Sequence, residues 1–566
     1  MTCLNSFMFE SQVMPDPKTQ AEDVGQRLRL RVPREDGTLY SVPGLDQAPR
    51  LAEENRQLLA AANTNIQGRP LSVLRAEARR SLCQAARSYT GTWAYVPTCS
   101  DATELVYVTG HQPLLFHPGV WVKNFAIGRL AEVPEAIGIN LVVDNDTFAS
   151  AALRVPAGNR EQPSFASIPF DSGHTARPWE GAEIQDRGLF ESFGARVAGA
   201  MRPWGIDPLI RELWPLVVER SRVSPQFADC FTAGRNQLER RWGVNNLELP
   251  LSRLCQSEAF LWFFSHIAAQ LPRFREVYNT ALTEFRAINK LRSHTHPVPE
   301  LRQCDDWLEA PFWIWQDGSH DRQRVFVRQA GREIHLRDDG DIFAKLPLTP
   351  DGEACCAVEV LRDLPGRGYH LRTRALTTTL FSRLCLGDLF LHGIGGAKYD
   401  EMTDRIIARF YGIRPPSFMA VSATVLLPLN PYPVQADDVS RAQLMLRELR
   451  YNPEKYLSES QIAEYAPLLE EKRRLLSEAD RQRGRSLSSH ERRAGRHARS
   501  ARARRLRNIT EVFATAVADQ SKRIVHDQRE LEEHLAANQV LASREFSFTL
   551  YSEDKLRPFM ETVGVS

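Results

Sequence analysis

Residues able to act on phosphates and amines gather directly after short apolar segments of the chain. The first cluster follows a run of β-forming residues and consists of Gly110, His111, Gln112, His117 and Gly119. Two imidazoles near a helix start could bind phosphate oxygens and transfer protons, helped by free backbone N–H groups. Glycine and proline at this density are also typical of a turn that has no further role.

A second cluster, Asp144, Asn145 and Asp146, follows the next apolar run, residues 139–143. Paired carboxylates at this place could hold Mg²⁺, orient a ribose or bind a substrate amine. The same residue types also favour a turn at a strand end. We take Asp144 and Asp146, with His111 and His117, as the candidate catalytic residues, and Asn145 as a substrate contact.

A third cluster lies far downstream and consists of Gly393, Gly395, Gly396 and Lys398. Glycines let a phosphate approach the backbone, and a lysine at a helix start adds positive charge. The spacing matches neither GxxxxGK[ST] nor GxGxxG, so neither nucleotide motif is present. A lone glycine turn is the alternative interpretation.

Four further residues are candidates for contacting the substrate. Arg372 and Arg374 follow another β-forming segment and could clamp an anion, or could be ordinary surface arginines. Tyr399 and Asp400 continue the predicted helix after the third cluster. Histidines at 294, 296 and 320 have no ligand spacing with nearby acids, and we assign no metal site.

The elements around these clusters predict a parallel α/β sheet in two blocks. Residues 104–143 show a strand–helix–strand pattern, and similar strands and helices return over 369–427. Ligands bind such sheets beyond the carboxyl ends of the strands, where all three clusters fall. We predict five segments: an N-terminal helical flank (1–100), the first half of a Rossmann-like core (101–150), an inserted α+β segment containing a β-meander at 323–344 (151–365), the second half of the core (366–450) and a C-terminal helical coiled-coil arm (451–566).

The C-terminal arm shows the spacing of a coiled coil. From residue 506 to residue 541 apolar or small residues recur at steps of three and four, predicting one long helix in an antiparallel hairpin. A homodimer formed through this arm, with solvated arginines, is the favoured interpretation. Binding of nucleic acid is the alternative.

The 566 residues include 72 Lys and Arg and 70 Asp and Glu, a net charge of +2. This total hides a strong polarity, because residues 471–507 hold 14 basic and four acidic residues, a net of +10. The remainder therefore carries −8, and the near-neutral total does not exclude a polyanionic partner. No apolar stretch approaches the roughly 20 residues of a membrane helix, no secretory signal is evident, and none of the nine cysteines forms CxxC. We expect a cytoplasmic protein with reduced thiols and no membrane contact.

The first two clusters resemble the bacillithiol-synthesis cysteine-adding enzymes. Thr109-Gly110 and Gln112 match that family's turn, Lys123 falls at or near its lysine, and Asp144 and Asp146 match its two aspartates. Histidine at 111 replaces a glutamine, valine at 143 and asparagine at 145 replace a glutamate and a histidine, and lysine at 398 stands where the family has a glutamate.

The resemblance implies a Rossmann-like, nucleotidylyltransferase-like core and binding of an adenine nucleotide, ATP or ADP. Gly110, Gln112, Gly119 and Lys123 would then belong to the nucleotide site, together with the third cluster. The activity implied is a ligase of low-molecular-weight thiol biosynthesis, which joins a cysteine-like amino acid to an amine such as an amino-sugar conjugate. The alternatives are a nucleotidyl transferase with another acceptor, or a non-enzymatic RNA-binding or scaffold protein.

Overall fold

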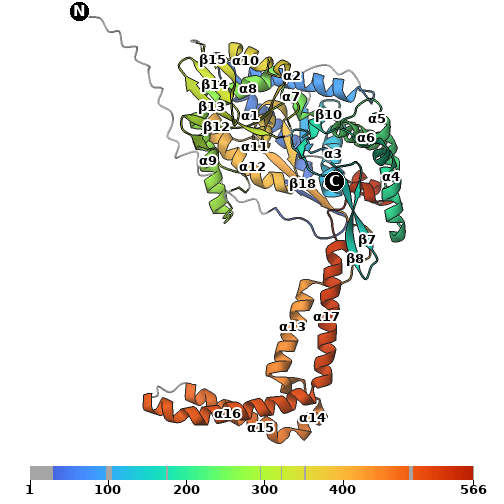
Figure 1. The fold of residues 1–566 in the computed structure, drawn as a ribbon, viewed down its shortest axis with the longest axis vertical. Helices are drawn as coiled ribbons and strands as arrows, with labels where there is room; N and C mark the ends of the chain where they lie inside the picture. The colour runs from blue at the N-terminus through green and yellow to red at the C-terminus, as the bar shows by residue number, and fades with distance from the viewer. Residues whose placement is uncertain are drawn as a thin grey trace, which may run out of the picture. The chain divides into compact units, whose positions relative to one another are not determined.

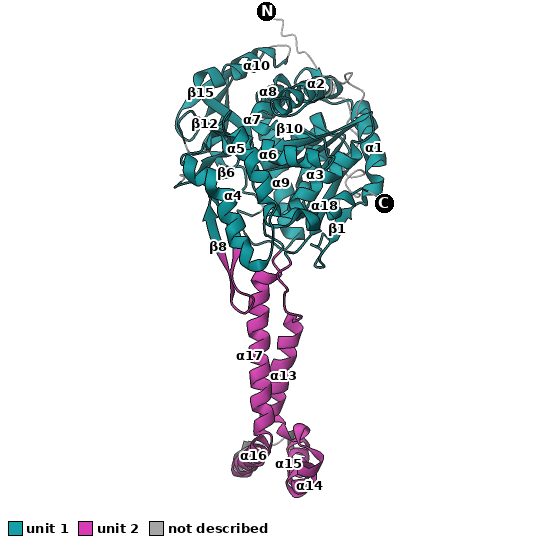
Figure 2. Ribbon diagram, turned by 90° about the vertical axis from the view of Figure 1, so that its right-hand side faces the viewer, with its two compact units in different colours: residues 1–155, 166–427, 544–566 teal, residues 156–165, 428–543 magenta. Residues whose placement is uncertain are grey.

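The computed structural model describes residues 30–96, 105–173, 176–293, 295–296, 298–319, 321–349, 352–483 and 489–564. The chain divides into two compact units, coloured separately in Figure 2. Unit 1 comprises residues 1–155, 166–427 and 544–566, and unit 2 comprises 156–165 and 428–543. The sequence predicts an arm that begins at 451, whereas unit 2 already includes residues from 428. The last 23 residues, 544–566, belong to unit 1.

Unit 1 is built on a six-stranded sheet, sheet A, visible behind the helices in Figure 1. Its strands, in spatial order, are β1 (Thr38–Val42), β18 (Phe418–Thr424), β17 (Leu389–His392), β4 (Leu105–His111), β5 (Ala136–Val142) and β10 (Leu247–Pro250). All neighbouring pairs are parallel except β1 with β18. Counted along the chain, the parallel strands run fifth, fourth, first, second, third, so their order reverses between β4 and β17. This is the order of a Rossmann-like core, and the prediction of a split, mainly parallel α/β sheet is confirmed.

Two strands of sheet A come from segments predicted to lie outside the core. β1 belongs to the predicted helical flank, and β10 belongs to the predicted insert. The sequence pattern does not reveal β10, because its four residues are too few to show alternation and include the acidic Glu248, which such a pattern places on the surface. Conversely β16 (Tyr369–Thr373), predicted as a strand of the parallel core, pairs antiparallel with β12 in a second sheet.

Helices cover both faces of sheet A. On one face, Val106 and Val108 of β4 join a large apolar core with Leu74 of α2 (Leu71–Thr90) and the aromatic side chains of α8 (Glu258–Ala269). On the other face α3 (Pro118–Leu130), almost wholly buried, packs against β4, β5 and β18. α12 (Ile394–Ile406) follows β17 and packs on β18.

The second sheet, sheet F, is antiparallel. Its strands are β11 (Gln303–Cys304), β12 (Trp307–Gln316), β13 (Gln323–Ala330), β14 (Glu333–Arg337), β15 (Ile342–Pro347) and β16. The meander predicted over 323–344 is confirmed by β13, β14 and β15. The remaining elements of unit 1 or at its border are α1 (Ala48–Ala61), β2 (Asn65–Ile66), β3 (Arg69–Pro70), β6 (Thr147–Phe148), β7 (Ala152–Gly158), β8 (Pro163–Pro169), β9 (Arg177–Pro178), α4 (Arg187–Met201), α5 (Ile210–Arg220), α6 (Phe227–Arg241), α7 (Leu251–Leu254), α9 (Leu271–Ile288), α10 (Cys355–Arg362), α11 (Ala375–Phe381) and α18 (Glu553–Glu561).

Unit 2 is helical apart from a short β segment. Its helices are α13 (Ala436–Tyr451), α14 (Glu459–Glu464), α15 (Ala466–Arg483), α16 (Ser489–Ala516) and α17 (Ala518–Leu541). α13 lies alongside α17, as both views show (Figures 1 and 2). The single helix predicted over 506–541 is divided at Val517, whose backbone leaves the helical region between α16 and α17.

The apolar positions predicted as a coiled-coil seam are buried inside unit 2. Ile509, Phe513 and Ile524 form one cluster with Leu449 and Leu457 of the same chain. The residues that would have supplied a dimer interface are therefore largely used within the protein. Among the described residues no helix combines the length and apolarity needed to cross a membrane.

Candidate functional site

The ends of β4, β5 and β17 bring the three sequence clusters to one edge of sheet A. Thr109 of β4 pairs with Asn140 of β5 on one side and with Leu391 of β17 on the other. The residues that follow these three therefore leave the sheet at the same edge. This edge includes the place between β4 and β17 where the strand order reverses, which is where ligands bind in open α/β sheets.

Gln112 and Asp146 meet across the loops that follow β4 and β5. The Gln112 side chain donates a hydrogen bond through Nε2 to Oδ2 of Asp146. Oδ1 of Asp146 lies 3.0 Å from Nη1 of Arg322 and accepts a hydrogen bond of 2.8 Å from the Thr147 backbone. The side chain of Asp146 is 38% exposed, so a carboxylate with a fixed orientation is accessible at this edge.

Asp144 and Asn145 point into the protein and hold the β5 loop in place. Asp144 accepts hydrogen bonds from the backbone and hydroxyl of Ser252 and is 3% exposed. Burial and the neighbouring Glu180 raise the pKa of Asp144 to about 7. Asn145 donates to the Thr373 carbonyl at 2.8 Å. Both side chains are committed to protein partners, so their predicted contacts with substrate have no support in this geometry.

His111, the last residue of β4, and His117, the N-cap residue of α3, are both neutral at pH 7. Burial, followed by the positive charge of Lys123, lowers the pKa of His111 to about 3. Burial also lowers the pKa of His117 to about 4. His117 caps α3, because its Nδ1 accepts a hydrogen bond from the Gly119 backbone, and its Nε2 lies 3.6 Å from Glu545. A neutral imidazole beside a carboxylate disfavours an anion at this helix start.

Two glycines predicted to lie against a nucleotide are explained by packing. A Cβ at Gly119 would come within 2.3 Å of the Ala423 carbonyl of β18, and one at Gly110 within 3.1 Å of the Leu141 carbonyl of β5. Lys123 is buried as well, and donates from Nζ to the Gly110 carbonyl at 3.0 Å. Burial, with the positive charge of Arg235, lowers the pKa of Lys123 to about 8. These residues support the β4 loop from inside.

The start of α12 has a different character. Its N-cap residue, Gly393, provides no side chain to cap the helix. A Cβ at Gly393 or Gly395 would meet nothing within 4 Å, and Gly395 and Lys398 are exposed. Backbone N–H groups at a helix start attract anions, and open glycines leave room for a phosphate to reach them. The start of α12 therefore has space and exposed groups that could hold an anionic group.

Asp400, predicted to contact substrate, is instead part of a buried ion cluster. Its carboxylate lies 2.5 Å from Nη1 of Arg383 and 3.1 Å from Nε2 of His392. Burial acts to raise the pKa of Asp400, but the positive charge of Arg383 outweighs it and holds that pKa below its ordinary value. The hydroxyl of Tyr399 lies 3.3 Å from Nε2 of His296.

Arg372 and Arg374 do not form one anion clamp. Arg372 pairs with Glu180 at 2.9 Å, and Arg374 pairs with Glu309 at 2.8 Å, so each positive charge already has a negative partner. Residues two apart along a strand point to the same face, but Arg374 lies just past the end of β16 and stacks on Trp313.

Four residues beside the site were not predicted from the sequence, namely Glu180, Ser252, Glu309 and Arg322. Each lies in the predicted insert, more than 30 residues along the chain from the site residue that it contacts. Glu180 and Arg322 had no motif to mark them. In the described part of the chain no group of three or more His, Cys, Asp or Glu residues is placed to hold a metal ion.

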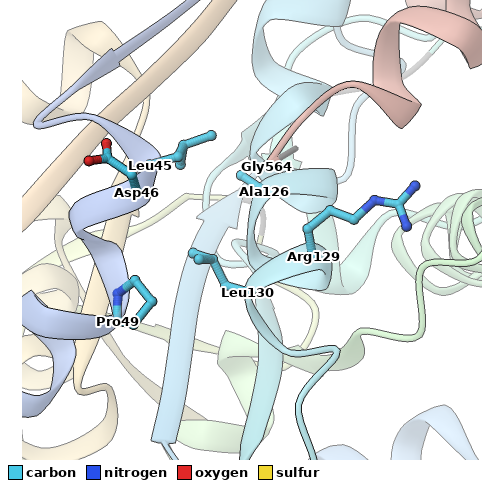
Figure 3. A pocket seen from close by; sticks show the side chains of 7 residues that line it. All are labelled: Leu45, Asp46, Pro49, Ala126, Arg129, Leu130 and Gly564. Atoms are coloured by element: carbon cyan, nitrogen blue, oxygen red, sulfur yellow. The ribbon is translucent and has the colours of Figure 1, made fainter. Parts of the chain in front are cut away.

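A separate hollow lies at the opposite end of α3 (Figure 3). Ala126, Arg129 and Leu130 of α3 face the segment containing Leu45, with Asp46, Pro49 and Gly564 completing the lining. None of the predicted site residues contributes to this hollow, since they follow the carboxyl ends of the strands.

The predicted residues thus divide into two groups. Gln112, Asp146, Gly393, Gly395 and Lys398 leave ligand-accessible groups at the edge of sheet A, whereas most of the others support this edge from within. Comparison with family models and with curated proteins finds no match to this chain.

Proposed function

We propose that this chain is an enzyme that binds a phosphate-bearing small molecule at the edge between β4 and β17. An adenine nucleotide is the first candidate, and the reaction is the joining of a cysteine-like amino acid to an amine-bearing small molecule. One observation carries the proposal. The uncapped glycine start of α12 and the Gln112–Asp146 pair follow adjacent strands on the two sides of the point where the strand order reverses.

The start of α12 supports the phosphate part of the proposal. Gly393 and Gly395 leave open space around the first turn, and Lys398 adds an exposed positive charge one turn later. The start of α3, in contrast, has Glu545 beside its cap and glycine positions filled by packing. Phosphate binding is therefore assigned to α12 rather than to the predicted His111–His117 turn.

Asp146 supports the amine part of the proposal. Its carboxylate is fixed by Gln112 on one oxygen and by Arg322 on the other, and it remains partly exposed. A carboxylate in this state is a strong acceptor for an ammonium group. Gln112 and Arg322 would orient it toward an amine bound at the edge.

The chemistry requires an activated carboxyl group on the amino acid. A bound nucleotide would supply the phosphoryl or adenylyl group that turns a carboxylate oxygen into a leaving group. The bound ammonium group first loses a proton to solvent, which frees the nitrogen electron pair. The nitrogen then forms a bond with the acyl carbon, the carbon–oxygen bond to the phosphate breaks, and the nitrogen gives its second proton to solvent. Asp146 would hold the amine, and α12 would stabilise the negative charge on the departing phosphate.

Nucleotidyl transfer to another acceptor is the second candidate. The strand order of sheet A favours it equally, because a Rossmann-like core with a phosphate site at the switch point suits both reactions. Release of pyrophosphate without formation of an amide would support this second candidate.

The test uses the full-length protein with ATP, Mg²⁺, cysteine and a panel of amines that includes amino-sugar conjugates. Mass spectrometry would detect the condensation product, and phosphate and pyrophosphate would be measured in parallel. Asp146→Ala is expected to lower product formation at least about tenfold, whereas the exposed Asp207→Ala is a matched control that leaves it unchanged. Absence of both product and nucleotide turnover with every amine would overturn the proposal.

A further inference from the structure

The helices of unit 2 concentrate the positive charge of the chain. Residues 471–507 carry a net charge of +10, while the rest of the protein is acidic. α15 and α16, which pack against each other, contain most of this segment. This concentration of net positive charge creates a surface that attracts polyanions within about one Debye length.

The apolar side of α16 is already occupied. Ile509 and Phe513 lie in the core of unit 2, where Leu468, Leu469 and Leu475 of α15 pack against them. Arg505 joins the same two helices through Glu471, with Nη2 and Oε2 2.7 Å apart. Between residues 496 and 507, the exposed side chains of α16 are basic, polar or small.

Four exposed arginines define what we call the arginine face of α16, namely Arg496, Arg499, Arg504 and Arg507. At 100° per residue, three of them (496, 499 and 507) lie within about 80° of one another, and Arg504 lies beside Arg507. Together they extend over about 16 Å of helix, since each residue adds about 1.5 Å. Several phosphates of one nucleic acid lie within that length, because a duplex carries one charge about every 1.7 Å.

Four of the residues between these arginines are small. Ala498, Ser500, Ala501 and Ala503 make this part of α16 a slender helix, and segment 471–507 contains no Phe, Trp or Tyr. Binding of single strands relies on aromatic side chains on which bases stack, so a single strand is a poor fit. An anionic membrane surface is a poor fit too, because an interfacial helix needs a large apolar face toward the lipid.

A duplex is therefore the polyanion that fits best, and its groove geometry distinguishes DNA from RNA. The major groove of B-DNA, about 12 Å wide, admits an α-helix. The major groove of A-form RNA is deep and narrow. Arginine and small residues provide contacts with phosphates but few groups that read base edges.

We infer that unit 2 binds double-stranded DNA, without sequence specificity, by placing α16 along the major groove so that its arginine face contacts the phosphates that border the groove. This binding surface is separate from the site proposed on sheet A and does not depend on the reaction proposed there.

The inference is tested by fluorescence anisotropy with the full-length protein and a short labelled DNA duplex of random sequence. Salt would be varied between about 50 and 200 mM. The patch variant combines R496Q, R504Q and R507Q, which remove three charges while keeping good helix formers. The matched control combines R447Q, R450Q and R523Q, three exposed arginines of α13 and α17. Circular dichroism would establish that the helix content of both variants is unchanged.

The wild-type affinity should fall steeply with salt. The slope of log K against log salt should become less negative by about 0.9 for each phosphate that the protein no longer neutralises, hence by about 2 to 3 in the patch variant. The control should keep most of the wild-type affinity. The inference is overturned if the wild type does not bind the duplex, or if the two variants lose affinity equally. Preference for an RNA duplex of the same length, or for anionic vesicles over DNA, would overturn it as well.

Discussion

Gln112 donates a hydrogen bond through its side-chain amide to the carboxylate of Asp146, and this contact joins the loops after two neighbouring parallel strands. Both residues belong to the sequence clusters on which the resemblance to the cysteine-adding enzymes rests. The contact holds the accessible carboxylate of the proposed site at a fixed position beside the point where the strand order reverses.

This contact should be worth more than an ordinary surface hydrogen bond. We expect Gln112→Leu to lower the free energy of unfolding by about 1.5–3 kcal/mol, because the substitution removes a hydrogen bond to a charged group in a half-buried site. Urea denaturation of the wild type and the variant measures this change in the free energy of unfolding. Gln57→Leu, which removes an exposed hydrogen bond from Gln57 to Glu53 on α1, is the matched control and should cost less than about 0.5 kcal/mol. Equal effects of the two substitutions would contradict the fixed Gln112–Asp146 contact.

The partly buried His111 should make stability fall in acid. Its folded pKa of about 3 lies below the ordinary value of 6.5. Between these values the unfolded chain binds a proton that the folded chain does not, so stability is lost as pH falls. As pH falls through this range, the unfolding free energy of the wild type should decrease by about 1.4 kcal/mol per pH unit relative to that of His111→Gln. A difference that stays constant from pH 7 to pH 4 would show that His111 is accessible to protons in the folded protein.

Asp400 should behave as a structural residue. Replacing it by asparagine removes one of the two carboxylates that neutralise the buried Arg383, since Asp404 also lies 2.6 Å from that guanidinium, and we expect a loss of about 1.5–3 kcal/mol in the free energy of unfolding. The exposed Lys398→Ala on the same helix should change stability by less than about 0.5 kcal/mol. If Asp400→Asn keeps full stability and loses only substrate binding, Asp400 would be a substrate contact, as its place in the sequence suggests.

The sequence predicted the first strand–helix–strand unit because its periodicity is local. β4, α3 and β5 each show their apolar pattern within a dozen residues, and the polar residues at their ends lie at the edge that the topology requires. The contact between Gln112 and Asp146 then follows from the pairing of adjacent strands.

Other features depend on contacts that the sequence pattern does not contain. Glu248 of β10 is buried because Arg235 neutralises it, with Nη2 and Oε2 2.6 Å apart, yet an acidic residue in a short segment predicts exposure. The ion pairs of Asp400 and Arg372 are absent from the sequence pattern for the same reason, since Arg383 lies 17 residues from Asp400 and Glu180 lies 192 residues from Arg372 along the chain. The sequence does not distinguish Gly110 and Gly119 from Gly393 and Gly395. A Cβ at either of the first two would lie against a neighbouring carbonyl, whereas one at either of the last two would meet nothing within 4 Å.

The central claim is that the start of α12 binds phosphate, and titration calorimetry with ATP on the Gly395 variants tests it most directly. Gly395→Ala adds a methyl group in open space, and Gly395→Asp adds a negative charge that a helix start tolerates well. We predict that ATP binds the wild type and Gly395→Ala with similar affinity, and that Gly395→Asp weakens binding at least about tenfold while unfolding at the same temperature or higher. Binding of ATP to Gly395→Asp as tight as to the wild type, or no binding to the wild type, would contradict the account.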